Sequence, residues 1–111
     1  MNLVYIASPY RGDVGSNVEM AKQYCAYAVQ CGFLPICPHI YFTAFLDDTD
    51  ETQRQRGISM GLQLLGSCSK VWVFGEVTEG MRQEIDEAER LGIPVAYRDW
   101  RNEQCISTLT I

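Results

Sequence analysis

The stretch that decides the fold is Val71–Gly75 (Val-Trp-Val-Phe-Gly), followed closely by Thr78–Glu84 (Thr-Glu-Gly-Met-Arg-Gln-Glu). The first segment is a continuous apolar run that ends at a glycine, which predicts a strand buried on both faces. The second segment opens a helical pattern that we expect to run from about Thr78 to Leu91, with Gly92 after its last turn. A buried strand that leads directly into a helix is the unit from which parallel α/β sheets are built.

Glu84 is the unusual residue of this expected helix. On a helical wheel it falls on the apolar face, together with Met81, Ala88 and Leu91. A carboxylate on an inward face is costly unless it is hydrogen-bonded or faces a cavity, so this position is a candidate for chemistry. The alternative is that Glu84 lies at the rim of the face, where it reaches solvent or pairs with an arginine.

Further apolar runs and helical patterns alternate along the rest of the chain. The other apolar runs are Leu3–Ala7, Phe33–Ile36 and Ile93–Tyr97. The other helical patterns are residues 16–32, which open with a capping box of Ser16 and Glu19, and residues 50–66. This alternation predicts one α/β domain over residues 1–111. Its expected form is a small doubly wound, flavodoxin- or Rossmann-like parallel sheet of four to five strands between two helical layers. The tail, residues 105–111, is a candidate for the fifth strand.

The first helical pattern carries two apolar stripes. One stripe consists of Val18, Ala21, Cys25 and Ala28, and the other of Met20, Tyr24, Tyr27 and Cys31. One stripe is enough to cover a sheet, so the second needs another partner. We therefore expect a homo-oligomer, a dimer or higher, with an interface at this helix. The alternative is that a later loop of the same chain buries the second stripe.

Composition excludes several classes of protein. A hydrophobic content of 47% indicates a packed globule, and a net charge of −5 with interspersed signs argues against a nucleic-acid polymer as partner. No apolar run has the length of a membrane span, and no metal-ligand spacing or cofactor motif is present. The five cysteines form no C-x-x-C pair, so we expect reduced thiols and a cytoplasmic location.

Three expected loops meet where such a fold binds its ligand, beyond the carboxyl ends of the strands: residues 8–16, 37–49 and 75–80. The first loop offers the hydroxyl of Ser8, the guanidinium of Arg11 and the permissive Gly12, with Tyr10 between them. These groups suit a phosphate or a sugar hydroxyl, although a stretch of this kind is also an ordinary turn. The loop is neither a Walker loop nor a G-x-G-x-x-G motif, so nucleoside triphosphates and dinucleotides are not indicated.

The other charged or titratable residues of these loops each have two interpretations. His39, the only histidine, either contacts substrate or is structural. Asp47 and Asp48 either reach the same pocket as Glu84 or are solvated capping residues. Arg54 either holds a carboxylate or phosphate in the pocket or lies exposed in a first helical turn.

Together these segments resemble the nucleoside 2-deoxyribosyltransferase-like superfamily, above all its small bacterial and phage members. The resemblance rests on Tyr5–Gly12, the Pro38-His39 step, the Thr78-x-Gly80-x-x-x-Glu84 motif and Gly92–Val95, and it extends over residues 3–98. It implies that Glu84 attacks the anomeric carbon of the sugar. It also implies that Thr78, with Gly80 and Met81, contacts sugar or phosphate, as do Ser8, Tyr10, Arg11 and Gly12.

One departure from the family pattern affects the leaving group. Ser69 stands where the transferases often carry an aspartate near the third strand, so the acid that assists the departing base is unassigned. Asp47 and Asp48 are the candidates.

The sequence therefore predicts an enzyme that needs no cofactor or metal and acts on a small-molecule nucleoside or nucleoside 5′-monophosphate. It would cleave the N-glycosidic bond, or transfer the sugar, through a covalent glycosyl-enzyme on Glu84. The alternative is a non-catalytic nucleotide- or nucleoside-binding module of the same fold, used for sensing. A third possibility is a structural oligomer whose pocket is vestigial.

Overall fold

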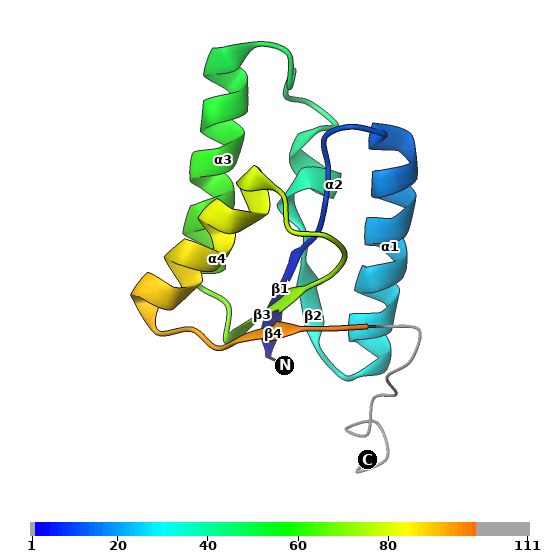
Figure 1. The fold of residues 1–111 in the computed structure, drawn as a ribbon, viewed down its shortest axis with the longest axis vertical. Coiled ribbons are helices and arrows are strands. Elements are labelled where there is room, and N and C mark those ends of the chain that lie inside the picture. The colour runs from blue at the N-terminus through cyan, green and yellow to red at the C-terminus, as the bar shows by residue number, and fades with distance from the viewer. Residues whose placement is uncertain (1, 100–111) are drawn as a thin grey trace.

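In the computed structural model, which describes residues 2–99, strands and helices alternate along the chain (Figure 1). The strands are β1 (Leu3–Ala7), β2 (Leu34–Ile36), β3 (Lys70–Val73) and β4 (Val95–Tyr97). The helices are α1 (Val14–Gln30), α2 (Pro38–Phe42), α3 (Glu51–Leu65) and α4 (Glu79–Leu91). The four strands form one parallel sheet in the order β2-β1-β3-β4. The predicted doubly wound α/β fold is confirmed, whereas the expected strand at residues 105–111 lies outside the described residues.

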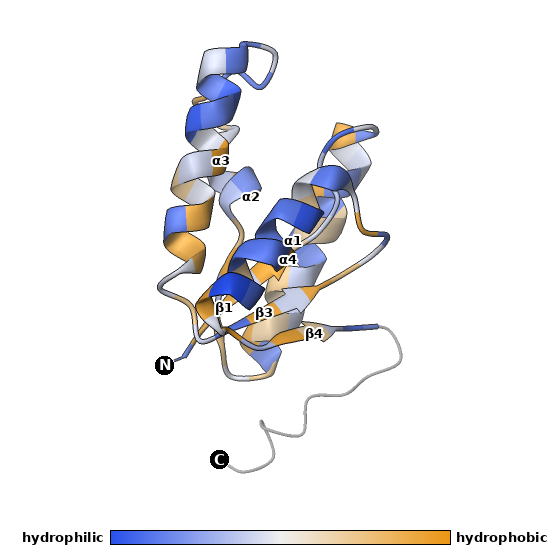
Figure 2. Ribbon diagram, turned by 60° about the vertical axis from the view of Figure 1, so that its left-hand side comes forward, coloured by the Kyte–Doolittle hydropathy of each residue, from blue (hydrophilic) through white to orange (hydrophobic). Residues whose placement is uncertain are grey.

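Successive side chains of a strand point to opposite faces of the sheet. Because the central strands are largely apolar, both faces carry apolar side chains, and helices cover both. Val4 and Ile6 of β1 pack in one hydrophobic cluster with α1, whereas Tyr5 and Ala7 pack in a second cluster with α3 and α4. Figure 1 shows α1 on one side of the sheet and the pair of α3 and α4 on the other. In Figure 2 the exposed side of α4 is hydrophilic and the strands behind it are hydrophobic. The three-layer α/β/α arrangement follows from this double burial.

The strand order places a switch point between β1 and β3. The chain leaves β1 through α1 towards β2 on one side, and leaves β3 through α4 towards β4 on the other. Loops that leave neighbouring strands in opposite directions open a crevice between them at the carboxyl edge of the sheet. The residues after Ala7 and after Val73 therefore border the place where a ligand is expected.

The start of α1 differs from the predicted capping box. Asp13 is the N-cap residue, and its side chain accepts a hydrogen bond of 3.2 Å from the backbone N–H of Ser16. Glu19 instead pairs with Lys22 at 3.4 Å. Both Asp and Ser are strong N-caps, so the pattern alone did not separate them. The end of the helix is as expected, with Gly32 in the left-handed region at φ 87°.

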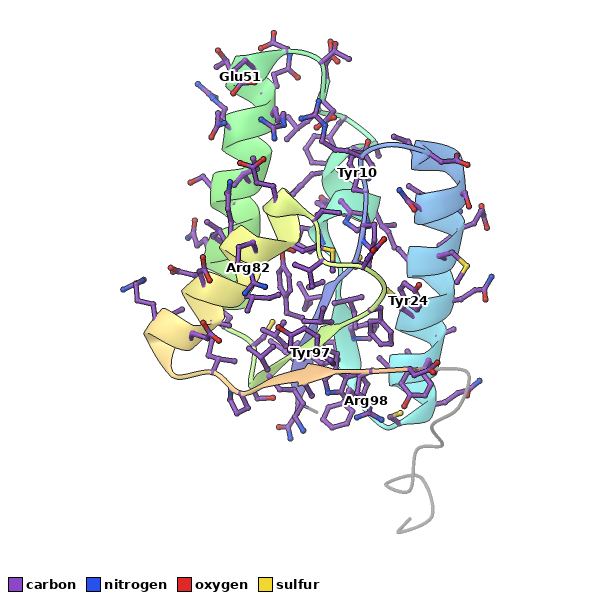
Figure 3. All side chains as sticks on the ribbon, in the orientation of Figure 1. Tyr10, Tyr24, Glu51, Arg82, Tyr97 and Arg98 are labelled. Atoms are coloured by element: carbon purple, nitrogen blue, oxygen red, sulfur yellow. The ribbon has the colours of Figure 1, made fainter. Side chains whose placement is uncertain are left out.

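The second apolar stripe of α1 is buried within its own chain. Tyr24 stacks on Phe74 with a centroid distance of 4.3 Å, and Tyr27 lies 5.8 Å from Trp72. In Figure 3 the side chain of Tyr24 lies between α1 and the sheet. The cover comes from β3 and the residue that follows it, so this stripe gives no reason to expect a subunit interface. The homo-oligomer stays a prediction without this support.

Residues 37–49 are not a plain loop, as the sequence suggested, but contain the short helix α2. Pro38 occupies the first position of this helix, where proline is favoured because no N–H partner is needed there. Five residues are too few to show a helical period, which explains why the pattern missed the element. The other helix boundaries agree with expectation: Asp50 caps α3 and Thr78 caps α4.

Three of the cysteines, Cys25, Cys37 and Cys68, are free thiols, in agreement with expectation. Cys31 is disulfide-bonded, so the expectation of a reduced thiol is wrong at this position. None of the helices in residues 2–99 has the length and apolar character needed to cross a membrane.

Candidate functional site

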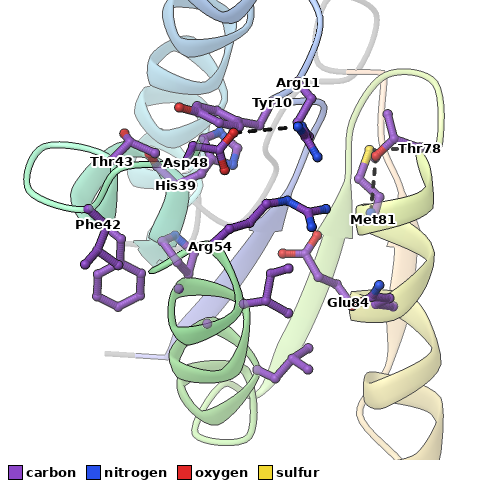
Figure 4. Close-up of a pocket in the computed structure, with 18 of the residues that line it drawn as sticks. Tyr10, Arg11, His39, Phe42, Thr43, Asp48, Arg54, Thr78, Met81 and Glu84 are labelled. Carbon is purple, nitrogen blue, oxygen red and sulfur yellow. Dashed lines mark hydrogen bonds and ion pairs between the residues drawn. The ribbon is translucent and has the colours of Figure 1, made fainter. Parts of the chain in front are cut away.

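A cavity of about 650 Å³ lies beyond the carboxyl end of β1, between α2, α3 and the first turns of α4 (Figure 4). It is the size of pockets that hold small molecules. The wall on the sheet and α4 side carries most of the predicted site residues: Ser8, Tyr10, Arg11, Thr78, Gly80, Met81 and Glu84. His39 and Asp48 complete this set from the segment between β2 and α3. Two other predicted residues, Gly12 and Asp47, are not among the residues that line the cavity.

Glu84 lies on the flank of α4 that faces the cavity. The buried face of this helix is formed by Met81, Ile85 and Ala88, while Leu91 is 41% exposed. The expectation that Leu91 shares a buried face with Glu84 is therefore wrong, because the buried face is centred on Ile85 and Leu91 lies outside it.

Burial raises the pKa of Glu84 to about 7, although the hydrogen bond from Tyr5 acts in the opposite direction. At neutral pH this carboxyl group is poised between its two protonation states.

Tyr5 is the partner of Glu84. Its hydroxyl, at the centre of β1, donates a hydrogen bond to Oε2 of Glu84. Burial, followed by the negative charge of Glu84, raises the pKa of Tyr5 well above its ordinary value, so the hydroxyl remains a donor. Helix α3 reaches this pair through Gly61, where an added Cβ would lie 3.5 Å from the Tyr5 hydroxyl oxygen.

Ser8 supplies a polar group at the floor of the cavity. The residue is 4% exposed, and its Oγ has no hydrogen-bond partner within the described part of the chain. A buried hydroxyl without a partner is rare, because its desolvation is not offset. A ligand in the cavity would meet this hydroxyl as both donor and acceptor.

Two contacts link the first loop to the segment that follows β2. Arg11 Nε lies 3.8 Å from Asp48 Oδ2, and the rings of Tyr10 and His39 are 5.2 Å apart. Asp47 instead closes its own turn: its side chain accepts hydrogen bonds from the backbone N–H of Thr49 at 2.9 Å and from its hydroxyl at 2.6 Å. The two adjacent aspartates therefore differ in position, and Asp48 is the one at the cavity.

His39 is a neutral group at the cavity wall. Burial lowers its pKa to about 4, so the imidazole is uncharged at neutral pH. Its Nε2 lies 3.7 Å from the Sγ of Cys37. The ring can therefore give or accept one hydrogen bond at the cavity without a change in charge.

Arg54 reaches the cavity, so of its two interpretations the exposed position in a first helical turn is wrong. Its side chain is 25% exposed and Nη1 lies 3.6 Å from Oε2 of Glu51. Figure 4 shows the guanidinium directed across the cavity towards Glu84. Ser69, by contrast, donates a hydrogen bond of 2.9 Å to the carbonyl of Leu3 and does not line the cavity.

Sequence reasoning treated two parts of the cavity wall as core. Tyr5 was assigned to a core strand, although a buried tyrosine hydroxyl needs a polar partner and so points to one nearby. The apolar wall opposite Glu84 is formed by α2, α3 and the segment between them: Phe42, Leu46, Ile58 and Leu62. Ile58 and Leu62 lie one helical turn apart on α3, and an apolar repeat of this kind looks the same whether the face lines a core or a cavity.

No group of three or more His, Cys, Asp or Glu side chains within residues 2–99 is arranged to hold a metal ion. The site combines the Glu84 carboxyl group and its phenolic partner with the carboxyl group of Asp48, an unpartnered hydroxyl, two arginines and an apolar wall.

Comparison with known proteins places this chain in a family. Residues 2–98 match the family described as "Domain of unknown function (DUF7768)", and the chain belongs to that family. A solved structure of a 2-deoxyribosyltransferase from the psychrotolerant bacterium Bacillus psychrosaccharolyticus is similar, with a TM-score of 0.67 and 15% sequence identity. That match covers 90% of this chain and 88% of the other. At this identity the likeness shows a shared fold. No curated protein sequence matches the chain.

Proposed function

We propose that this protein breaks the N-glycosidic bond of a nucleoside or nucleoside 5′-monophosphate, with Glu84 as the nucleophile. The observation that carries the proposal is the carboxyl group of Glu84, held by the Tyr5 hydroxyl at the wall of a cavity large enough for a nucleoside. The shared fold with a 2-deoxyribosyltransferase supports the same substrate class.

The chemistry follows from a single carboxylate at the anomeric carbon. A Glu84 oxygen forms a bond to C1′ while the C1′–N bond breaks, and the base leaves with the electron pair of that bond. The positive charge that develops on the sugar is stabilised by the negative carboxylate. Water or a second base then attacks C1′ and frees Glu84, which gives hydrolysis or transfer respectively.

Asp48 is the group that we assign to proton delivery to the departing base. Of the two aspartates at this position, it is the one that lines the cavity. A general acid of this kind contributes about a hundredfold or more to the rate. The apolar wall, which includes Phe42 and Ile58, suits the faces of a base between Asp48 and the sugar.

The test is release of free base, measured by chromatography, from a panel of ribonucleosides, deoxynucleosides and their 5′-monophosphates, with and without an added acceptor base. Wild type is run beside Glu84→Ala. Release by wild type alone supports the proposal and defines the substrate class. Thermal stabilisation by a nucleoside or nucleotide without base release would select a binding module instead, as the position of Ser69 away from the cavity would also suggest. If no compound of the panel stabilises the protein and none releases a base, both the enzyme and the binding module are contradicted.

A further inference from the structure

Arg54 presents its guanidinium group to the cavity from near the start of α3. Its side chain is 25% exposed, and Figure 4 shows the guanidinium directed across the cavity towards Glu84. Within residues 2–99 its one ion pair joins Nη1 to Oε2 of Glu51 at 3.6 Å, which is too long for a hydrogen bond, and the Glu51 side chain is 73% exposed. The five N–H donors of the guanidinium therefore have no acceptor among these residues and are available to a ligand.

Helix α3 continues from Arg54 as an apolar wall of the cavity. Ile58 and Leu62 follow at intervals of one helical turn, and both line the cavity. Gly57 lies on the same wall, and an added Cβ there would lie 3.5 Å from Cδ1 of Leu46, which is an ordinary contact distance. No close contact with a described residue therefore requires glycine at this position, although glycine destabilises the interior of a helix relative to alanine. The missing side chain leaves room beside Arg54 for a flat ligand group.

The wall and the guanidinium together match a purine base. An apolar wall suits the face of a base, and a guanidinium at the end of that wall can reach the edge of the base. A guanidinium is a rigid fork that forms two parallel hydrogen bonds only with two adjacent acceptors. Guanine and hypoxanthine offer such a pair in O6 and N7, whereas adenine places its amino donor beside N7.

We propose that Arg54 recognises the base of the substrate and selects a 6-oxopurine, guanine or hypoxanthine, through paired hydrogen bonds to O6 and N7. The inference rests on the proposed function, because it takes the anomeric carbon of the sugar to lie at Glu84. Both residues line the cavity, and within the described part of the chain no ion pair joins them. The base attached to that carbon can therefore occupy the space between them, with one face on the wall that contains Ile58.

The first test is equilibrium binding, measured by isothermal titration calorimetry with Glu84→Gln, in which the nucleosides stay intact. The ligands are 2′-deoxyguanosine, 7-deaza-2′-deoxyguanosine, which lacks the N7 acceptor, 2′-deoxyadenosine and 2′-deoxycytidine. We expect 2′-deoxyguanosine to bind at least about tenfold more tightly than each of the others. Equal affinities, or no binding by any of these nucleosides, would overturn the inference. Tightest binding by 2′-deoxycytidine, whose O2 and N3 are also adjacent acceptors, would overturn the choice of a purine.

Substitutions of Arg54, made together with Glu84→Gln, test its role in this preference. Arg54→Met keeps the length of the side chain and removes the donors, so the preference for 2′-deoxyguanosine over 2′-deoxyadenosine should fall to about threefold or less. Arg54→Lys keeps the charge but not the fork and should retain only part of the preference. Arg56→Met is the matched control, because Arg56 is exposed on the same helix and is not among the residues that line the cavity, so the preference should be unchanged. A full preference in Arg54→Met would contradict the proposal.

The 5′-monophosphates of the same nucleosides separate a contact to the base from a contact to phosphate. If Arg54→Met weakens binding of all the monophosphates equally and leaves the nucleosides unaffected, Arg54 binds phosphate and the inference is overturned. Base release by wild type tests the proposed function separately. Release without preference among the bases would keep the reaction and overturn the role of Arg54, whereas a binding preference without release would keep base recognition and overturn the reaction.

Discussion

The phenolic hydroxyl of Tyr5 donates a hydrogen bond to the carboxyl group of Glu84, which lies 79 residues further along the chain. Tyr5 belongs to the central strand β1 and Glu84 to α4, so the packing of that helix on the sheet sets this contact. Tyr5 is 1% exposed, and its ring is fixed among the core residues of this face. The rigid core therefore orients the carboxyl group that acts as nucleophile in the proposed reaction.

Tyr5→Phe should displace the pH dependence of activity. The Tyr5 hydrogen bond lowers the pKa of Glu84, so its removal raises that pKa and the ionised nucleophile forms only at higher pH. A hydrogen bond to a charged group contributes about 1.5–3 kcal/mol, so kcat/KM at pH 7 should fall by about tenfold or more. The measurement is the pH profile of kcat/KM, which should rise at higher pH than in wild type. Tyr10→Phe, which alters another tyrosine of the cavity, should leave the pH at which kcat/KM rises unchanged. If that pH is also unchanged in Tyr5→Phe, the account is contradicted.

Glu84→Gln should stabilise the protein at high pH. The folded state holds a proton on Glu84 up to a pKa of about 7, whereas the unfolded state loses it near 4.5. As the pH rises from 4.5 to 7, wild type therefore loses free energy of unfolding, on the order of 3 kcal/mol in total. Urea denaturation should show the variant more stable than wild type at pH 8, with a smaller difference at pH 4.5. A difference that does not change with pH would argue against a buried carboxyl group.

His39→Gln should have the opposite pH dependence. The folded imidazole protonates only near pH 4, whereas the unfolded one does so near 6.5. The unfolded state therefore binds more protons in this window, and wild type loses free energy of unfolding as the pH falls from 6.5 to 4. The variant lacks this loss, so denaturation curves should show its advantage over wild type growing as the pH falls. If the advantage stays constant between about pH 7 and 4.5, His39 is solvated rather than buried.

Glu84 and His39 have opposite effects on the free energy of unfolding between pH 4.5 and 6.5. The raised pKa of Glu84 makes that free energy fall as the pH rises, and the lowered pKa of His39 makes it rise. In wild type these two contributions therefore partly offset each other across this range. The Glu84→Gln variant should gain stability with rising pH there, and His39→Gln should lose it. Parallel slopes in the two variants would contradict the opposite protonation behaviour of the two groups.

Asp48→Asn and Asp47→Asn form a matched pair that tests the leaving-group acid. Asp48 lines the cavity, whereas Asp47 accepts hydrogen bonds from Thr49 within its own turn. Loss of a general acid should lower kcat by about a hundredfold in Asp48→Asn, and Asp47→Asn should retain nearly wild-type kcat. The effect should be smaller for substrates with better leaving bases. Equal losses in both variants would point to a role in loop structure instead.

The sequence predicted the strands well because a sheet buried on both faces leaves continuous apolar runs, such as Leu3–Ala7 and the run that begins at Val71. Helix α4 was predicted equally well, since Thr78 and Gly92 mark its ends. Helix α2 was not, because its five residues are too short for a period. The two tyrosines of the second α1 stripe were assigned to an interface because a pattern shows that a face is apolar without showing what covers it.

The site was predictable in part for the same reason. The switch point of a doubly wound sheet brings the loops after β1 and β3 together, which placed Ser8, Arg11 and Thr78 correctly at one cavity. The role of Tyr5 at the site was not predicted, because this residue lies within an apolar run that was read as core. Asp47 and Asp48 are adjacent and chemically identical, so only the course of the turn distinguishes the one that faces the cavity.

The central claim is that Glu84 is the nucleophile, and base release by Glu84→Gln beside wild type at about pH 8, where the wild-type carboxyl group is ionised, tests it most directly. The amide keeps the shape of the side chain and can still accept the hydrogen bond of Tyr5, and circular dichroism verifies that the variant is folded. We expect wild type to release base and the variant to be slower by at least about a thousandfold, since the covalent route is closed. Release by the folded variant at a rate close to that of wild type would contradict the account.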